Sequence, residues 1–133
     1  QLTAYDMLFL CKNETWINLT KLSLSNSKIG SQGAAVLGKT ENWPNLRILE
    51  LNFAEIGHLG GAALSKNESW KKLEQLDLIG NGLGHYGAKT LSQSNWMMLT
   101  SLHLDFNEIG AQGAIDLSQN NTWVNLTNLS LTC

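Results

Sequence analysis

The sequence predicts an α/β solenoid, a stack of short units that each contribute one strand to a parallel sheet and one helix to a layer beside it. Tryptophan recurs along the 133 residues at intervals of 27, 27, 26 and 27 residues, and a leucine follows three residues after each tryptophan. A fixed period of this length is typical of a repeat architecture, in which each unit buries its apolar face only against its neighbours. The tryptophans are Trp16, Trp43, Trp70, Trp96 and Trp123, and the leucines are Leu19, Leu46, Leu73, Leu99 and Leu126.

The period divides a single domain spanning residues 1–133 into four full repeats with a partial repeat at each end. Residues 1–15 align with the helical half of a repeat, but Thr3 and Asp6 stand where the full repeats carry glycine. Since an end unit has a neighbour on one side only, this departure predicts a terminal helix or partial repeat. The full repeats are residues 16–42, 43–69, 70–95 and 96–122, and the last partial repeat is residues 123–133.

Each repeat carries a strand pattern followed by a helix pattern. Leucines alternate with other residues over about five positions, and apolar residues at helical spacing follow. A strand followed by a helix, repeated without reversal, predicts a parallel sheet on the concave face and α-helices on the convex face. The strands are expected at residues 21–25, 48–52, 75–79, 101–105 and 128–132, and the helices after Gly30, Gly57, Gly84 and Gly110.

The interior of the repeat raises two packing expectations. A second glycine inside each helix costs about 1 kcal/mol relative to alanine, so we expect the helix to lie close to the strand layer or to its neighbour. The tryptophans are expected to pack as core between repeats, although a stacked column of rings could also form a ligand platform. The second glycines are Gly33, Gly60, Gly87 and Gly113.

The ninth position of the repeat is uneven. An asparagine there bonds backbone groups in the loop beyond the strand, which have no strand partner. Because Ala54 cannot do so, we expect a local irregularity or a bridging water beside it. The column reads Ser27, Ala54, Asn81 and Asn107.

One repeat displays the complete pattern. Leu99, Leu102, Leu104 and Asn107 follow an LxxLxLxxN frame, and IGAQGAIDLS comes next. With these residues the chain resembles the leucine-rich repeat superfamily, and within it the ribonuclease-inhibitor-like class, over nearly all of residues 2–131. The Trp-terminated unit, as in SKNESWKKL and SQNNTWVNL, resembles repeats of bacterial proteins with intracellular or host-associated lifestyles. The resemblance implies a protein-interaction scaffold with no cofactor and no intrinsic catalysis.

Composition argues against two classes of partner. The net charge of −2 and a pI near 5.9 give no basic face of the kind that binds nucleic acid. No apolar run approaches the roughly 20 residues of a membrane-spanning helix. We therefore expect a protein partner, with no nucleic acid and no membrane.

The cysteines and the sequons point to different compartments. The stack is expected to separate Cys11 from Cys133 by roughly 20 Å, about four strand spacings, which is too far for a disulfide. Two free thiols favour a reducing compartment, either the cytoplasm or the cytosol of a host cell into which the protein is delivered. Secretion is the alternative, because six N-x-S/T sequons occur at Asn13, Asn18, Asn67, Asn120, Asn125 and Asn128.

The sequence offers no constellation for catalysis or metal binding. His58 and His85 occupy equivalent positions, but Ser31 and Ala111 stand at the same place in the other repeats, so no third ligand joins them. No nucleophile, base and orienting residue converge on one face, and the glycines belong to the repeat rather than to a phosphate loop. We expect neither a metal site nor an enzyme.

The candidate site lies on the concave face, where alternate strand residues point away from the helices. One interpretation is a shallow acidic groove for a basic protein partner, with two phenylalanines at the strand exits as apolar anchors. The other is that the polar residues only keep the sheet soluble and that one or both phenylalanines pack inward under the loops. The candidate residues are Glu50, Asn52, Phe53, Asp77, His103, Asp105 and Phe106.

The ends of the stack suggest a second function. No helix follows the last strand, residues 126–131, so its outer edge would be unprotected. Because the chain begins at Gln1 and ends inside a repeat, we expect it to be a piece of a longer protein; end-to-end association of two chains is the alternative. The favoured function is a non-catalytic module that binds a protein through its concave face, and the alternative is a structural or assembly module that associates through its ends. A sensor domain that regulates a catalytic neighbour is a third reading.

Overall fold

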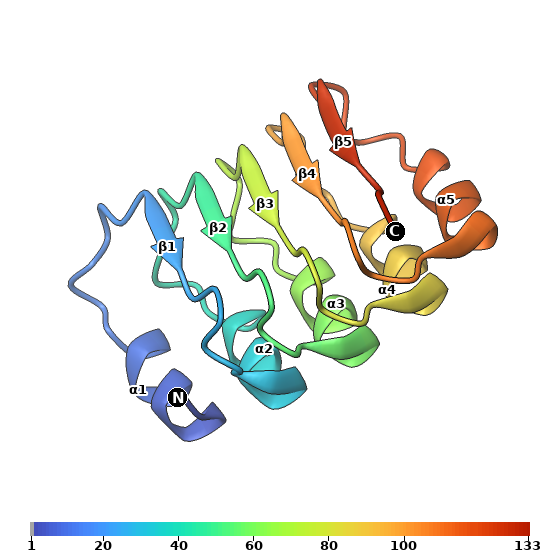
Figure 1. Ribbon diagram of the computed structural model, residues 1–133. Coiled ribbons are helices and arrows are strands. Elements are labelled where there is room, and N and C mark those ends of the chain that lie inside the picture. The colour runs from blue at the N-terminus through green and yellow to red at the C-terminus, as the bar shows by residue number, and fades with distance from the viewer. Residues whose placement is uncertain (1) are drawn as a thin grey trace.

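The computed structural model describes residues 2–133, in which helices and strands alternate and stack along one direction (Figure 1). The strands lie side by side in one layer, and the helices form a second layer behind them. No helix in this part of the chain is long and apolar enough to cross a membrane. The elements are α1 (Ala4–Cys11), β1 (Lys21–Ser23), α2 (Gly30–Leu37), β2 (Ile48–Glu50), α3 (Gly57–Ser65), β3 (Gln75–Asp77), α4 (Gly84–Leu91), β4 (Ser101–His103), α5 (Gly110–Ser118) and β5 (Asn128–Ser130).

The strands pair in parallel and in sequence order, from β1 at one edge to β5 at the other. Because the repeat period is nearly constant, residues at the same repeat position are register partners. The sheet is open, with its helices on one side, which confirms the predicted α/β solenoid. The central residues of the strands form one aligned column, Leu22, Leu49, Leu76, Leu102 and Leu129.

The regular strands are three residues long and therefore shorter than predicted. Parallel hydrogen bonding nevertheless continues past them. The Leu51 N–H donates to the Asp77 carbonyl at 2.8 Å, and the Phe53 N–H donates to the Ile79 carbonyl at 2.8 Å. Phe53 then takes a left-handed φ of +53°, which turns the chain out of the extended conformation. The predicted strand ends thus mark where the hydrogen-bonded ladder stops.

The core lies between the two layers and is formed by leucines, isoleucines and tryptophans. Trp43, Trp70 and Trp96 are fully buried, as a core position between repeats requires, and Trp123 is buried as well. Trp16 is the exception, since its side chain is 44% exposed. The expectation that all five tryptophans are core is wrong for Trp16, because in the described part of the chain only helix α1 precedes it and leaves its ring partly uncovered.

The glycines inside the helices allow neighbouring helices to pack closely. A Cβ atom on Gly60 would lie 2.7 Å from Ile56 Cβ and 3.0 Å from Ala34 Cβ of the preceding helix. A Cβ atom on Gly113 would likewise lie 3.1 Å from Ala88 Cβ. Contacts of 3.0–3.1 Å are tighter than nine in ten real Cβ contacts, so glycine at this position lets α2 approach α3 and α4 approach α5 closely.

Helix α1 begins with a capping box in place of the two glycines. The Asp6 N–H donates to Thr3 Oγ1, and the Thr3 N–H donates to the Asp6 carboxylate at 2.7 Å. These hydrogen bonds hold the pKa of Asp6 below its usual value. Met7 and Cys11 are buried, whereas Tyr5 is exposed. The substituted residues therefore start the first helix, as expected for a terminal unit.

Asparagines before the tryptophans tie successive repeats together. Asn67 is buried, and its Nδ2 donates to the carbonyls of Gly38 at 3.1 Å and Thr40 at 2.9 Å. Its Oδ1 accepts the N–H groups of Ser69 and Trp70. Asn120 makes the equivalent bonds two repeats later. At these two positions the N-x-S/T-W pattern satisfies backbone groups of two adjacent repeats.

Candidate functional site

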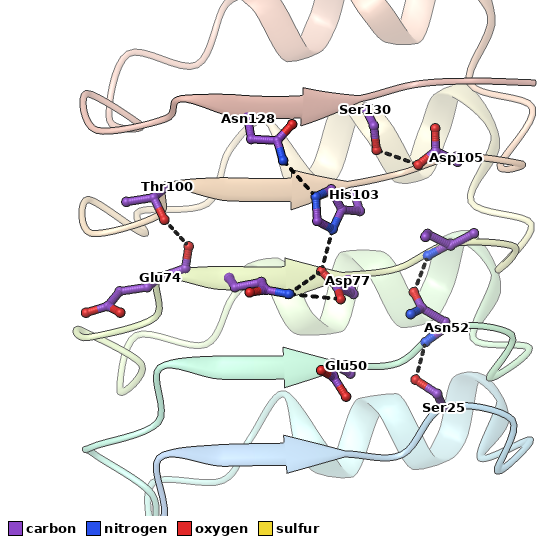
Figure 2. A network of polar contacts seen from close by, with 12 residues as sticks. Ser25, Glu50, Asn52, Glu74, Asp77, Thr100, His103, Asp105, Asn128 and Ser130 are labelled. Atoms are coloured by element: carbon purple, nitrogen blue, oxygen red, sulfur yellow. Dashed lines mark hydrogen bonds and ion pairs between the residues drawn. The ribbon is translucent and has the colours of Figure 1, made fainter.

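A row of polar side chains crosses the concave face of the sheet (Figure 2). Parallel register pairs Glu50 with Asp77, Asp77 with His103, and His103 with Ser130. The structure thus brings the predicted residues of β2, β3 and β4 into one column, and residues after the strands form a second column beside it. We call this surface the concave strip, and its members are Glu50, Asn52, Asp77, His103, Asp105, Asn128 and Ser130.

The first strands carry ion pairs across neighbouring repeats. Lys21 Nζ lies 2.5 Å from Glu50 Oε1, and Arg47 Nη1 lies 2.5 Å from Glu74 Oε1. Hydrogen bonds from Lys21 and then Ser23 hold the pKa of Glu50 below its usual value. In this part of the sheet each carboxylate therefore has its own cation.

A hydrogen-bonded chain crosses β3, β4 and β5. His103 Nδ1 lies 2.7 Å from Asp77 Oδ1, and His103 Nε2 lies 3.1 Å from Asn128 Nδ2. Gln75 Nε2 donates to Asp77 Oδ2 at 3.1 Å. A neutral imidazole with its proton on Nδ1 satisfies both contacts, since it donates to the carboxylate and accepts from the amide. Asp77, only 8% exposed, is bound by His103 and Gln75 and not by Lys or Arg.

Asp105 is bound by hydroxyl groups and by a backbone N–H. Its carboxylate accepts the Thr132 N–H at 2.7 Å and the hydroxyls of Ser130 and Thr132. The Ser130 hydroxyl, followed by Thr132, holds the pKa of Asp105 below its usual value. Asn52 plays a related role, because its Oδ1 accepts the Ile79 N–H at 2.9 Å. Asp105 and Asn52 therefore also support the backbone of the next repeat.

Phe53 and Phe106 lie beside the concave strip and are exposed, at 49% and 61%. The interpretation that these rings pack inward under the loops is wrong for both. Both residues have left-handed φ angles, +53° and +55°, as do Asn26 and Gly80 at the same position of other repeats. The Phe53 ring lies over Gly80, where a Cβ atom would collide with it.

The repeats match a known family. A family model described as Leucine Rich repeat matches residues 17–38, 44–65 and 97–118, and each match contains one strand and the helix after it. The chain carries leucine-rich repeats. No curated protein matches the sequence. Leucine-rich repeats generally mediate protein–protein interactions and are typically non-catalytic.

The asparagine ladder of these leucine-rich repeats runs through the C-terminal half of the chain. Asn107 Oδ1 accepts the N–H groups of Asn81 at 3.0 Å and Leu83 at 3.2 Å, while its Nδ2 donates to the Leu78 and Leu104 carbonyls. Asn81 makes the same set of bonds one repeat earlier.

The irregularity expected at Ala54 lies in the hydrogen bonds that an asparagine amide would make. The Ser27 N–H donates to the Leu24 carbonyl at 3.2 Å, whereas the equivalent Ala54 N–H donates to Asn81 Oδ1, but other backbone bonds are kept. The Gly30 N–H donates to the Ala54 carbonyl at 3.0 Å, and the Gly57 N–H donates to the Asn81 carbonyl at the same distance. The backbone hydrogen bond between adjacent loops is therefore kept even where the side-chain amide is missing.

Charge is distributed unevenly along the chain. Residues 1–72 contain eight basic and six acidic residues, whereas residues 73–133 contain five acidic residues and one basic residue, Lys89. The strand-exit loops follow this trend. Glu55 is paired with Lys28, the residue one repeat earlier, whose Nζ lies 2.9 Å from Glu55 Oε1. Glu108 has no such partner, because the residue one repeat earlier is Gly82. Within residues 2–133, Glu108 is exposed and has no ion-pair partner.

The remaining reactive side chains lie apart from the concave strip. His58 and His85 are exposed at the starts of α3 and α4. Among the described residues, no group of three or more His, Cys, Asp or Glu is placed to hold a metal ion. Both cysteines are free thiols, and burial raises the pKa of Cys11 to about 11.

The sequence interpretation missed the groups that bind the strip carboxylates. Lys21, Asn128 and Ser130 lie within the predicted strands, but the sequence did not identify them as partners of Glu50, His103 and Asp105. The signal that could have found them is their position one repeat away in the same or the adjacent column. The sequence interpretation also missed Glu108. The repeat position that it occupies reads Lys28, Glu55, Gly82 and Glu108, and the loss of the charged residue at Gly82 could have indicated that Glu108 has no partner.

Proposed function

We propose that this protein binds a basic protein partner through the concave strip. The observation that carries the proposal is the alignment of Glu50, Asp77 and His103 on the face of the sheet that the helices leave open. A continuous row of side chains from neighbouring strands suits an extended or convex partner surface. The family's general role in protein–protein interaction supports this assignment.

The strip residues divide into two roles in this proposal. Glu50, His103 and Asn128 are accessible at the surface and make the direct contacts. Asp77 and Asp105 are buried, and they act through the negative potential that they add to the strip. Such a potential accelerates association with a basic surface and disfavours an acidic one.

The test is a matched pair of charge reversals. A partner is first isolated with the wild-type chain, and its affinity is then measured for each variant by calorimetry. Glu50→Lys is expected to weaken binding by about tenfold or more, since it places a like charge against the partner. Glu68→Lys makes the same charge change at an exposed position outside the strip and serves as the control. Equal affinity of both variants and wild type would refute the concave site, with circular dichroism verifying that all three are folded.

A structural or assembly function is the second candidate, and the exposed apolar end of the stack favours it. Trp16, Ile17 and Leu8 are exposed beside β1 and α1. Contact through this end would cover an aromatic ring that every later repeat buries. Light scattering over a range of concentrations tests it: the wild type should self-associate and Trp16→Gln should not, while a strictly monomeric wild type rules it out.

We also propose that the repeats belong to the ribonuclease-inhibitor-like class. The support is the α-helix of eight or nine residues that follows β1, β2, β3 and β4. The tryptophan at the end of each unit supports the further likeness to repeats of bacterial host-associated proteins.

A further inference from the structure

Two exposed phenylalanines are present where the fold does not require an aromatic ring. Phe53 and Phe106 share their left-handed backbone conformation with Asn26, which shows that a small polar side chain satisfies the same position. Left-handed φ angles are uncommon for bulky residues and favour asparagine and glycine. The rings are therefore not explained by local conformation or by burial.

The two rings belong to the same column of the repeat, two repeats apart. Gly80 lies between them in the column and has no side chain, and the Phe53 ring leans over it. Neighbouring parallel strands are about 4.8 Å apart, so two repeats separate the phenylalanine backbones by roughly 10 Å. Both rings are exposed, so a planar side chain of a partner can reach either of them from solvent.

The charge around Phe106 is negative, and no lysine or arginine pairs with it among residues 2–133. Asp105 precedes Phe106, and the exposed Glu108 follows two residues later. Lys28 neutralises Glu55 at the equivalent position near Phe53, but no cation pairs with Glu108 in residues 2–133. The only lysine or arginine from residue 73 onward is Lys89, which belongs to helix α4 in the other layer.

We propose that Phe53, Phe106 and Glu108 form a docking surface for an arginine side chain of the protein partner. We call these residues with Gly80 and Gly82 the aromatic edge; the proposal rests on the proposed function and names the chemistry that the partner carries. A guanidinium group stacks on an aromatic face and forms hydrogen bonds to a carboxylate at the same time. An anionic ligand is disfavoured by Glu108 and Asp105. A purely apolar side chain would use the rings but leave Glu108 without a partner.

The test uses defined peptides and the full 133-residue chain. An acetylated, amidated Gly-Arg-Gly-Arg-Gly peptide is titrated into the 15N-labelled protein at low ionic strength, and amide shifts are followed by NMR. The expected result is saturable shifts centred on Gly80, Gly82 and Phe106. The same peptide with citrulline in place of arginine keeps the planar group but not its charge, and is expected to leave these amides unshifted. Equal shifts with both peptides would overturn the proposal that the aromatic edge binds the charged guanidinium group.

Matched variants assign the binding to the rings. The double variant Phe53→Asn/Phe106→Asn adopts the residue that the column already carries at Asn26, and is expected to bind the arginine peptide about tenfold more weakly. Phe9→Asn removes an equally exposed ring from α1 and should leave the affinity unchanged. Undiminished binding by the double variant would overturn the inference.

The pattern of shifts separates failure of this inference from failure of the proposed function. Shifts at Glu50, Gln75 and His103 without shifts at Gly80 and Gly82 would overturn the aromatic edge and leave the concave strip as the binding site. If neither the aromatic edge nor the concave strip showed shifts, both the arginine-binding proposal and the basic-partner proposal would be contradicted.

Discussion

The N-terminal and C-terminal halves of the sheet use the same geometry with different chemistry. Near β1 and β2, carboxylates face cations from the preceding repeat, as Glu50 faces Lys21 and Glu55 faces Lys28. From β3 to β5, Asp77 and Asp105 are held by imidazole, hydroxyl, amide and backbone groups. A repeat register fixes which positions meet, but the residue at each position decides whether a carboxylate is neutralised. Negative charge is therefore concentrated in the C-terminal half.

The same halves differ beneath the surface. Asn81 and Asn107 cross-link the loops of the C-terminal repeats, whereas Ser27 and Ala54 occupy the corresponding positions in the N-terminal repeats. Buried side-chain amides make strong demands on geometry, since a missing partner leaves several polar groups unsatisfied. The half that carries the uncompensated charge is thus also the half whose loops are held by side chains.

The largest expected effect comes from breaking the asparagine ladder. Asn107→Ala removes bonds to two backbone N–H groups and to the Leu78 and Leu104 carbonyls, all of them buried. We expect the free energy of unfolding to fall by about 3 kcal/mol. Urea denaturation measures it, with Asn107→Ser, the residue found at Ser27, as an intermediate control. A loss below about 1 kcal/mol would mean that water replaces the amide without cost.

The second effect concerns the charge held by hydroxyl groups. Asp105→Asn keeps the shape but weakens the bonds to Ser130 and Thr132, and we expect a loss of about 1–2 kcal/mol at pH 7. The pKa of Asp105 lies below its ordinary value of 3.8 in the folded chain. The unfolded chain therefore binds the proton more tightly, so this stabilisation is complete above about pH 4 and is lost as the pH falls through the lower, folded-state pKa.

Urea midpoints measured across this acidic range test the assignment to Asp105. The variant should lose part of the pH dependence that the wild type shows. Glu50→Gln should also lose part of the pH dependence. Only the effect of this variant should shrink in high salt, because Glu50 pairs with the full charge of Lys21 and exposed ion pairs are screened. Identical pH profiles for wild type and Asp105→Asn would contradict the role given to this carboxylate.

A third change transfers the ladder to the N-terminal half. Ala54→Asn places an amide where its Oδ1 can accept the N–H groups of Ser27 and Ile29, as Asn81 does for the next repeat. We expect a gain of about 1 kcal/mol, because the Ala54 backbone already follows the path of the asparagine positions. Thermal and urea unfolding measure the change. Destabilisation would indicate that neighbouring side chains have filled the space.

The smallest effect is expected from an exposed ion pair. Lys28→Met removes the partner of Glu55, both of which are at least half exposed, and we expect the free energy of unfolding to change by less than about 0.5 kcal/mol. A Glu55→Gln/Lys28→Met double-mutant cycle isolates the pair. A coupling well above that size would make the N-terminal ion pairs stabilising elements and would reduce the contrast between the halves.

The candidate site could be predicted as a set of columns, but not as a set of contacts. The period placed Glu50, Asp77 and His103 in line, and register pairing confirms that alignment. It could not tell that Asp105 is buried or that Phe106 is exposed, since both follow from backbone torsions at the strand exit. Trp16 was misjudged for a related reason, because burial depends on a neighbouring repeat and not on the motif itself.

The sequence by itself determined the architecture of this protein. A period of 26 or 27 residues brings like positions together, so parallel pairing, the leucine core and the polar concave face all follow from one pattern. The tertiary structure alone decided which carboxylates are neutralised and which aromatic rings reach solvent. The physical reason is that both depend on side-chain directions and on partners 25 to 29 residues away, as between Asp105 and Ser130 or Lys21 and Glu50.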